Sequence, residues 1–167
     1  MPQDEILDKK NQAYKQLQEQ EIPPIKPAIL LAKKLSIEKT KLNIKLALAS
    51  SAPRIEILRN LKAIGLEDVF DVIISGNDDL KDIVDKEGTN KPKPYIYQRL
   101  AEWLRLKPEN CVVFEDTNAG VIAAATAGMS VFAVPNRFTL YHDFSKATRI
   151  LNSLAELDVN FVNNPQE

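Results

Sequence analysis

Short apolar runs alternate along the chain with longer stretches in which apolar residues recur at helical spacing. Glycine or proline stands at several of the junctions between them. Apolar runs of about five residues without polar alternation are typical of parallel strands that are buried on both faces. The pattern predicts an α/β fold in which helices cover both faces of a parallel sheet. We expect strands at 44–49, 71–75, 111–114 and 131–134, and helices at 28–35, 54–64, 96–104 and 120–127.

The first 22 residues differ from the rest of the chain. Residues 4–20 are rich in Gln, Lys and Glu and carry only a weak helical stripe of apolar residues. The segment 22–27 contains three prolines, which remove backbone donors and favour extended geometry. The pattern predicts a helical appendage or linker over 1–22 and an α/β core over 23–167.

Composition limits the class of protein. With 44% apolar residues in 167, the chain can bury one sizeable core. The 22 basic and 23 acidic residues leave a net charge of −1, which gives no overall attraction to nucleic acid or to an anionic membrane. No apolar stretch approaches the roughly 20 residues of a membrane helix, and residues 1–20 do not resemble a signal peptide. Cys111, the single cysteine, is expected to be a buried thiol in a reducing compartment, which favours the cytoplasm. The sequence carries no signal for an oligomeric state.

Two adjacent acids, Glu115 and Asp116, follow the apolar run 112–114. The run should deliver them to the carboxyl edge of the sheet, where α/β proteins bind their ligands. Neighbouring carboxylates repel each other unless a cation lies beside them, and Mg²⁺ prefers such oxygen ligands. The alternative is that Asp116 or Thr117 only caps the next helix.

Ser50 and Lys91 are expected at the same edge of the sheet. A hydroxyl, an ammonium and a metal-binding acid pair could together hold a phosphoryl group. Each residue also has a simpler interpretation: Lys91 as a solvated lysine, and Ser50 as a helix cap, with Ser51 competing for either role. A receiver-type phosphorylation domain has similar residues, but its acid pair comes first and its lysine last, which argues against it here.

Other candidates have simpler explanations. We expect His142, the only histidine, on the surface, and Trp103 in the core beside Leu100 and Leu104. Asp78 and Asp79 are expected to shape a turn rather than to bind the metal.

Three segments resemble motifs of the haloacid dehalogenase superfamily of phosphohydrolases, in its β-phosphoglucomutase and phosphoglycolate-phosphatase-like branch. Residues 46–51 (LALASS) are similar to its second motif, 90–94 (NKPKP) to its third and 113–120 (VFEDTNAG) to its fourth. The resemblance runs from about Pro23 to Leu157 and implies a Rossmann-like parallel sheet.

The resemblance also implies roles for the candidate residues. Ser50, Ser51 and Lys91 would bind phosphate, with Ser50 and Lys91 also serving catalysis. Asp116 would bind Mg²⁺, with Glu115 as a second ligand or just behind it, and Lys91 would point toward Asp116. The substrate would be a small phosphorylated metabolite, and the enzyme would be of phosphatase or phosphomutase type.

The family's first motif, Asp-x-Asp-x-Thr/Val, is absent, because no Asp-x-Asp occurs in the chain. That motif supplies the nucleophilic aspartate and ends a central strand, which would lie between strands 44–49 and 111–114. Most of the helical cap would also precede Met1, and 1–22 resemble only its last helix. The gap would uncover about six large side chains at roughly 1.5–3 kcal/mol each, comparable with a domain's stability of about 5–15 kcal/mol. The chain alone is therefore expected to be inactive and to bind Mg²⁺ weakly or not at all. The alternative is a non-catalytic binding or interaction module derived from the same family.

Overall fold

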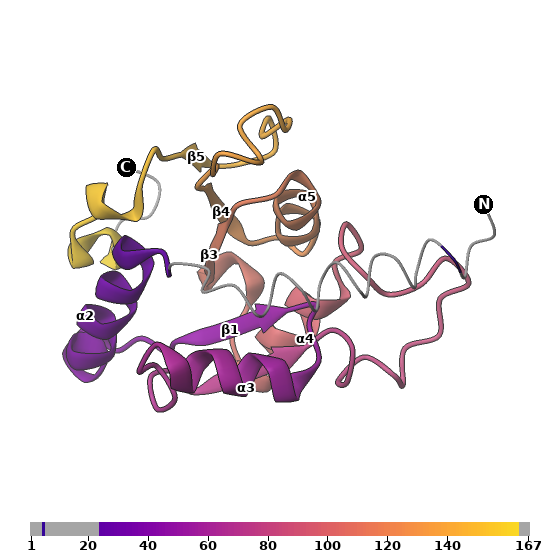
Figure 1. Ribbon diagram of the computed structural model, residues 1–167, viewed down its shortest axis with the longest axis horizontal. Coiled ribbons are helices and arrows are strands. Elements are labelled where there is room, and N and C mark those ends of the chain that lie inside the picture. The colour runs from indigo at the N-terminus through magenta and orange to yellow at the C-terminus, as the bar shows by residue number, and fades with distance from the viewer. Residues whose placement is uncertain (1–4, 6–23, 164–167) are drawn as a thin grey trace.

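The computed structural model describes Glu5 and residues 24–163 (Figure 1). The predicted appendage over 1–22 therefore lies outside the described residues, apart from Glu5, and the boundary between residues 22 and 23 stays a prediction. No helix in the described part of the chain is long and apolar enough to cross a membrane.

Helices and strands alternate as the sequence predicts, and every strand pair is parallel. All eight expected elements are present within a few residues of their predicted bounds, except that the first helix is much longer. The two-residue strand β5 and three short 3-10 turns were not predicted. The elements are α2 (Lys26–Leu42), β1 (Ala47–Ser50), α3 (Arg54–Ala63), β2 (Val72–Ser75), α4 (Tyr95–Leu104), η1 (Pro108–Asn110), β3 (Val112–Glu115), α5 (Asn118–Thr126), β4 (Ser130–Ala133), β5 (Arg149–Ile150), η2 (Leu154–Glu156) and η3 (Val159–Asn163).

The strands form two separate parallel sheets. β1 pairs with β2, and β3 pairs with β4, which in turn pairs with β5. β1 and β3 do not pair with each other, although both line one groove of about 900 Å³. The groove is lined by Ala47, Leu48 and Ala49 of β1 and by 112–115 of β3, with Leu100 and Leu104 of α4. The break in the sheet therefore falls where the sequence analysis expects a central strand to be absent.

Helices cover both faces of the strands. On one face, α4 and α5 pack against the strands around the fully buried Ile74, Val121 and Val131. On the other face, α3 and part of α2 pack over β1 and β2 around Ile57 and Leu61. Along β1 and β2, successive residues alternate between these two faces, as the two-residue period of a strand requires.

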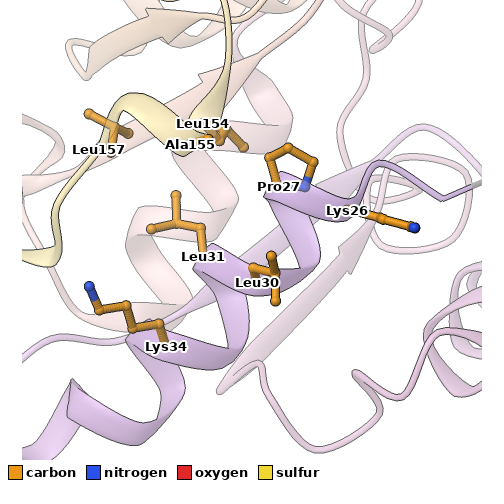
Figure 2. Close-up of a pocket in the computed structure, with 8 residues that line it drawn as sticks. All are labelled: Lys26, Pro27, Leu30, Leu31, Lys34, Leu154, Ala155 and Leu157. Carbon is orange, nitrogen blue, oxygen red and sulfur yellow. The ribbon is translucent and has the colours of Figure 1, made fainter.

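The C-terminal turns pack against α2. Leu154, Ala155 and Leu157 line a pocket with Pro27, Leu30, Leu31 and two lysines of α2 (Figure 2). Beyond this contact, the ring of Phe161 meets Phe114 of β3 edge to face, at 5.6 Å between ring centroids. The C-terminal segment therefore covers the face of β3 that lies away from α5.

Two expectations about single residues need correction. Trp103 is 44% exposed rather than in the core, because α4 buries Ile96, Tyr97, Leu100, Ala101 and Leu104 on one face, and position 103 falls beside that face. Cys111 is only half-buried, although burial still raises the pKa of its thiol.

Candidate active site

The site lies where β1 and β3 end, beside the loop that precedes α4. Ser50 is the last residue of β1 and Glu115 the last of β3. Lys91 reaches across from the loop and forms an ion pair with Glu115, in which the lysine side chain is 15% exposed and the glutamate 8%. The structure thus brings two of the predicted site residues into contact in a poorly solvated place, where the charges interact strongly.

The acid that Lys91 contacts is Glu115, whereas the sequence analysis expected Asp116. Neighbouring residues at a strand end point to opposite sides, so only one carboxylate of the pair can face the lysine. Asp116 is exposed, and its Oδ2 accepts a hydrogen bond from Asn136 Nδ2 at 2.9 Å. Lys91 therefore does contact the acid pair, through Glu115 rather than through Asp116.

Tyr97 of α4 joins the ion pair, and the sequence analysis did not single it out. Its hydroxyl donates to Glu115 Oε1 and accepts from Lys91 Nζ at 3.0 Å. Burial, followed by the negative charge of Glu115, strongly raises the pKa of the Tyr97 hydroxyl, which therefore stays protonated. A signal for this residue was present, because a tyrosine on the buried face of a helix usually needs a partner for its hydroxyl.

The start of α5 is built around Glu115. Thr117 is the N-cap, and its Oγ1 accepts from the backbone N–H of Gly120 at 3.1 Å. The Glu115 carboxylate lies so close to Gly120 that a Cβ there would clash with Oε2. Of the two possible caps, Thr117 has the role, and Asp116 is left facing solvent.

A loop over residues 136–143 is tied to this helix start. Besides the bond from Asn136 to Asp116, the backbone N–H of Asn118 donates to His142 Nδ1 at 3.2 Å. The Asn118 side chain donates to the carbonyl of Asp143. His142 is exposed, as predicted, and it also helps to hold the loop beside the acid pair.

Ser50 does not cap α3. That helix begins after Pro53 without a side-chain cap, and Ser50 Oγ instead accepts from the N–H of Ala52 at 3.2 Å. Ser51 is exposed. Among the described hydrogen bonds, Ser50 Oγ meets neither Lys91 nor the acid pair, so no hydrogen bond joins this predicted phosphate-binding serine to Lys91.

Asp78 and Asp79 hold the turn after β2, as the sequence analysis expected. Asp78 Oδ2 accepts from the N–H of Arg54 at 2.7 Å and from Ser75 Oγ at 3.0 Å, and these bonds lower the pKa of Asp78. Asp79 Oδ2 accepts from the N–H of Ser75 at 2.7 Å and pairs with Arg54. Both acids thereby fix the segment that follows Ser50.

The carboxylates of the acid pair are the type of ligand that Mg²⁺ prefers, but the pair supplies fewer ligands than the ion needs. Carboxylate oxygens suit Mg²⁺, which prefers octahedral oxygen coordination. No cluster of three or more His, Cys, Asp or Glu side chains that could hold a metal occurs among the residues that the structure describes. Only Asp116 offers an exposed carboxylate here, since Glu115 is held by Lys91 and Tyr97.

Comparison with known proteins agrees with this geometry. The family model of haloacid dehalogenase-like hydrolases matches residues 2–128. A putative phosphatase YhcW of Bacillus subtilis is 37% identical over 118 residues, covering 71% of this chain and 50% of the relative. A phosphorylated carbohydrates phosphatase of Thermotoga maritima is 44% identical over 86 residues, covering 52% of this chain and 36% of the relative.

A solved structure shows the same architecture. CbbY from Rhodobacter sphaeroides, in complex with phosphate, superposes with a TM-score of 0.64 at 31% identity, covering 75% of this chain and 53% of that chain. This chain thus spans about half the length of the first relatives it matches, or less. With the family model matched over most of its residues, the chain belongs to the haloacid dehalogenase-like hydrolases.

Proposed function

We propose that this chain is the core of a phosphohydrolase that, in its complete form, acts on a small phosphorylated metabolite through Mg²⁺-dependent phosphoryl transfer. The observation that carries the proposal is the contact of Lys91 with Glu115 at the carboxyl end of β3, next to the exposed Asp116. An ammonium beside an acid pair at this edge suits a ligand that is both anionic and metal-bound.

The residues of the site would bind the phosphoryl group. The Lys91 ammonium offsets its negative charge, and the hydroxyls of Ser50 and Ser51 donate to its oxygens. The turn that Asp78, Asp79 and Arg54 hold together keeps the Ser50 segment in place. When phosphate binds, Lys91 would gain a further hydrogen-bond acceptor, and its ion pair with Glu115 would weaken.

Asp116 is the residue we assign to the metal ion, with Glu115 as a further ligand or as the group that holds Lys91 beside it. Magnesium, when bound, would neutralise part of the charge on the phosphoryl oxygens. Asn136 keeps one carboxylate oxygen of Asp116 in a fixed direction through its 2.9 Å hydrogen bond.

The nucleophile would come from a strand in the groove between β1 and β3. A parallel strand there could pair with both free edges, and its last residue would reach the same edge of the sheet as Ser50 and Glu115. An aspartate at that position, as in the family's first motif, would attack phosphorus and break its bond to the substrate oxygen, which would leave as an alcohol after taking a proton from the second aspartate of the motif. Water would then hydrolyse the aspartyl-phosphate to inorganic phosphate and the free aspartate. The greater length of the matched relatives leaves room for such a strand.

The names of two relatives indicate a substrate class. The Thermotoga relative is named for phosphorylated carbohydrates, and a mutant of the Rhodobacter protein was solved with xylulose-1,5-bisphosphate. We therefore propose a phosphorylated sugar as the leading substrate class, in a reducing compartment such as the cytoplasm.

Binding of inorganic phosphate to the 167-residue chain tests the proposal without requiring turnover. Amide and lysine signals would be followed by NMR while phosphate is added with and without Mg²⁺. Shifts should appear at 50–52, Lys91 and 115–118, and Lys91→Met should remove them. Shifts confined to other parts of the chain would reject the site.

A further inference from the structure

The buried hydroxyl of Tyr97 is the least explained group at the site. The residue is 3% exposed, and its ring packs in the main core with Leu100 and Ala101. The hydroxyl nevertheless emerges at the one point where Lys91 and Glu115 meet. A core position alone would be filled equally well by phenylalanine, so the hydroxyl requires its own explanation.

We propose that the Tyr97 hydroxyl is a positioning group that holds the Lys91 ammonium and the Glu115 carboxylate together, so that Lys91 stays at the phosphate-binding edge. This inference rests on the proposed function, because it assumes that Lys91 binds phosphate there. Tyr97 contacts neither phosphate nor metal in this assignment, and it acts only through its two neighbours.

The direction of each hydrogen bond, from donor to acceptor, suits this role. A tyrosine hydroxyl has one proton to donate and lone pairs to accept. Here it donates to Glu115 Oε1 and accepts from Lys91 Nζ, while Lys91 also donates to Glu115 Oε1. The three groups form a closed triangle, and rotating any one of them breaks two contacts.

The ring contributes to the same effect. Lys91 Nζ lies 4.9 Å from the centroid of the Tyr97 ring, within the range of a cation–π contact. A lysine side chain has many rotamers, and these contacts with a rigid buried ring restrict them. Tyr97 thus reduces the freedom of Lys91 before any ligand binds.

The test compares Tyr97→Phe with Tyr95→Phe in the full 167-residue chain. Tyr95 lies on the same helix and also donates to a carboxylate, Asp85 Oδ2 at 2.8 Å, but its bond lies away from Lys91. Each substitution removes one tyrosine–carboxylate hydrogen bond and keeps the ring. The readouts are the solvent exchange of the ¹⁵N-labelled Lys91 ammonium protons, assigned with Lys91→Met, and the affinity for inorganic phosphate.

We expect Tyr97→Phe to speed exchange of the Lys91 ammonium protons and to weaken phosphate binding, each by about tenfold, as for loss of one hydrogen bond to a charged group. Tyr95→Phe should leave both within twofold of the parent chain. A folded Tyr97→Phe protein with unchanged ammonium exchange and phosphate affinity would overturn the inference.

The inference and the proposed function fail separately. If phosphate never shifts Lys91 in the parent chain but Tyr97→Phe frees the ammonium, the positioning role stands and the phosphate site falls. If phosphate shifts the Lys91 signal and Tyr97→Phe changes nothing, the phosphate site stands and the positioning role is rejected. If Tyr97→Phe does not fold, a second measurement on the parent chain tests the role. Nuclear Overhauser effects should connect the Tyr97 ring with the Lys91 ε protons, and their absence would contradict the positioning role.

Discussion

Glu115 folds its carboxylate over the α-carbon of Gly120, so that any side chain at position 120 would collide with it. The only glycine inside α5 is therefore part of the site, although it carries no chemistry. It lets Glu115 lie against the helix start and face Lys91. The fourth-motif spacing of an acid and a glycine five residues later has a direct steric reason in this chain.

Gly120→Ala should therefore displace Glu115 from Lys91 and Tyr97. The added methyl group forces the carboxylate to move, which breaks its hydrogen bonds and should lower the free energy of unfolding by about 1–3 kcal/mol. Denaturant unfolding measures the loss. Gly76→Ala is the matched control, because a Cβ there would meet the nearest atom, Ser51 Cα, at an ordinary 3.4 Å. Equal stability of the two variants would contradict the packing of Glu115 against Gly120.

Lys91→Met should destabilise the chain far more than Lys93→Met. Removing Lys91 leaves the poorly solvated Glu115 carboxylate without its cation, which typically costs about 3–5 kcal/mol. Lys93 pairs with Asp85 and Glu87 on a more open surface, where water screens the charges and such pairs contribute little to stability. Chemical unfolding at neutral pH compares the two, and similar losses would mean that the Lys91 pair is solvated.

The structure also makes a prediction about acid stability. The hydrogen bond from the Arg54 N–H, followed by that from Ser75 Oγ, holds the pKa of Asp78 below its usual value near 3.8. The folded state then favours the ionised form. Its contribution to stability is complete above the unfolded-state pKa and is lost as the pH falls through the lower folded-state pKa.

Asp78→Asn should remove this part of the pH dependence. Between neutral pH and about pH 3, the variant should lose less stability than the parent chain. Glu67→Gln, which removes an exposed carboxylate, should keep the parent's pH profile. Thermal unfolding across this range provides the comparison, and parallel profiles for Asp78→Asn and the parent would show that the ionised carboxylate does not stabilise the fold through its bonds to Arg54 and Ser75.

The 167-residue chain should have no measurable phosphatase activity. No residue in it matches the nucleophilic aspartate, and losing a nucleophile can cost about 10⁶-fold in turnover. A fusion that places a helical cap and an apolar strand ending in Asp-x-Asp before Met1 should hydrolyse sugar phosphates with Mg²⁺. The same fusion with the first aspartate changed to Asn is the matched control. Activity of the unextended chain that Asp116→Ala abolishes would show that another carboxylate is the nucleophile.

Local sequence was enough to predict the fold and the residues at its carboxyl edge. Apolar strand runs and their glycine and proline boundaries depend on neighbours in the chain, so β1, β2, β3 and β4 could be placed within a few residues. The helix predicted over 28–35 continues to Leu42, because 36–42 include the good helix formers Glu, Lys and Leu, and Asn43 ends it in a left-handed conformation.

Contacts between distant segments could not be predicted in the same way. Whether Glu115 or Asp116 faces Lys91 depends on how β3 is rotated relative to α4, and no local pattern encodes that rotation. The hydrogen bond from Asn136 to Asp116 spans 20 residues and requires the position of the loop after β4. The absence of a central strand was expected only through the family resemblance and stays a prediction; among the described residues, β1 and β3 do not pair with each other.

The titration of Lys91 with inorganic phosphate tests the central claim most directly. In a chain labelled with ¹⁵N-lysine, we predict that phosphate shifts the Lys91 ammonium signal in a saturable way, together with the amides at 50–52 and 115–118. Added Mg²⁺ should strengthen binding in the parent chain but not in Asp116→Asn. A Lys91 signal that stays fixed while phosphate shifts other lysines, such as Lys93, would contradict the assignment of this edge as a phosphate site.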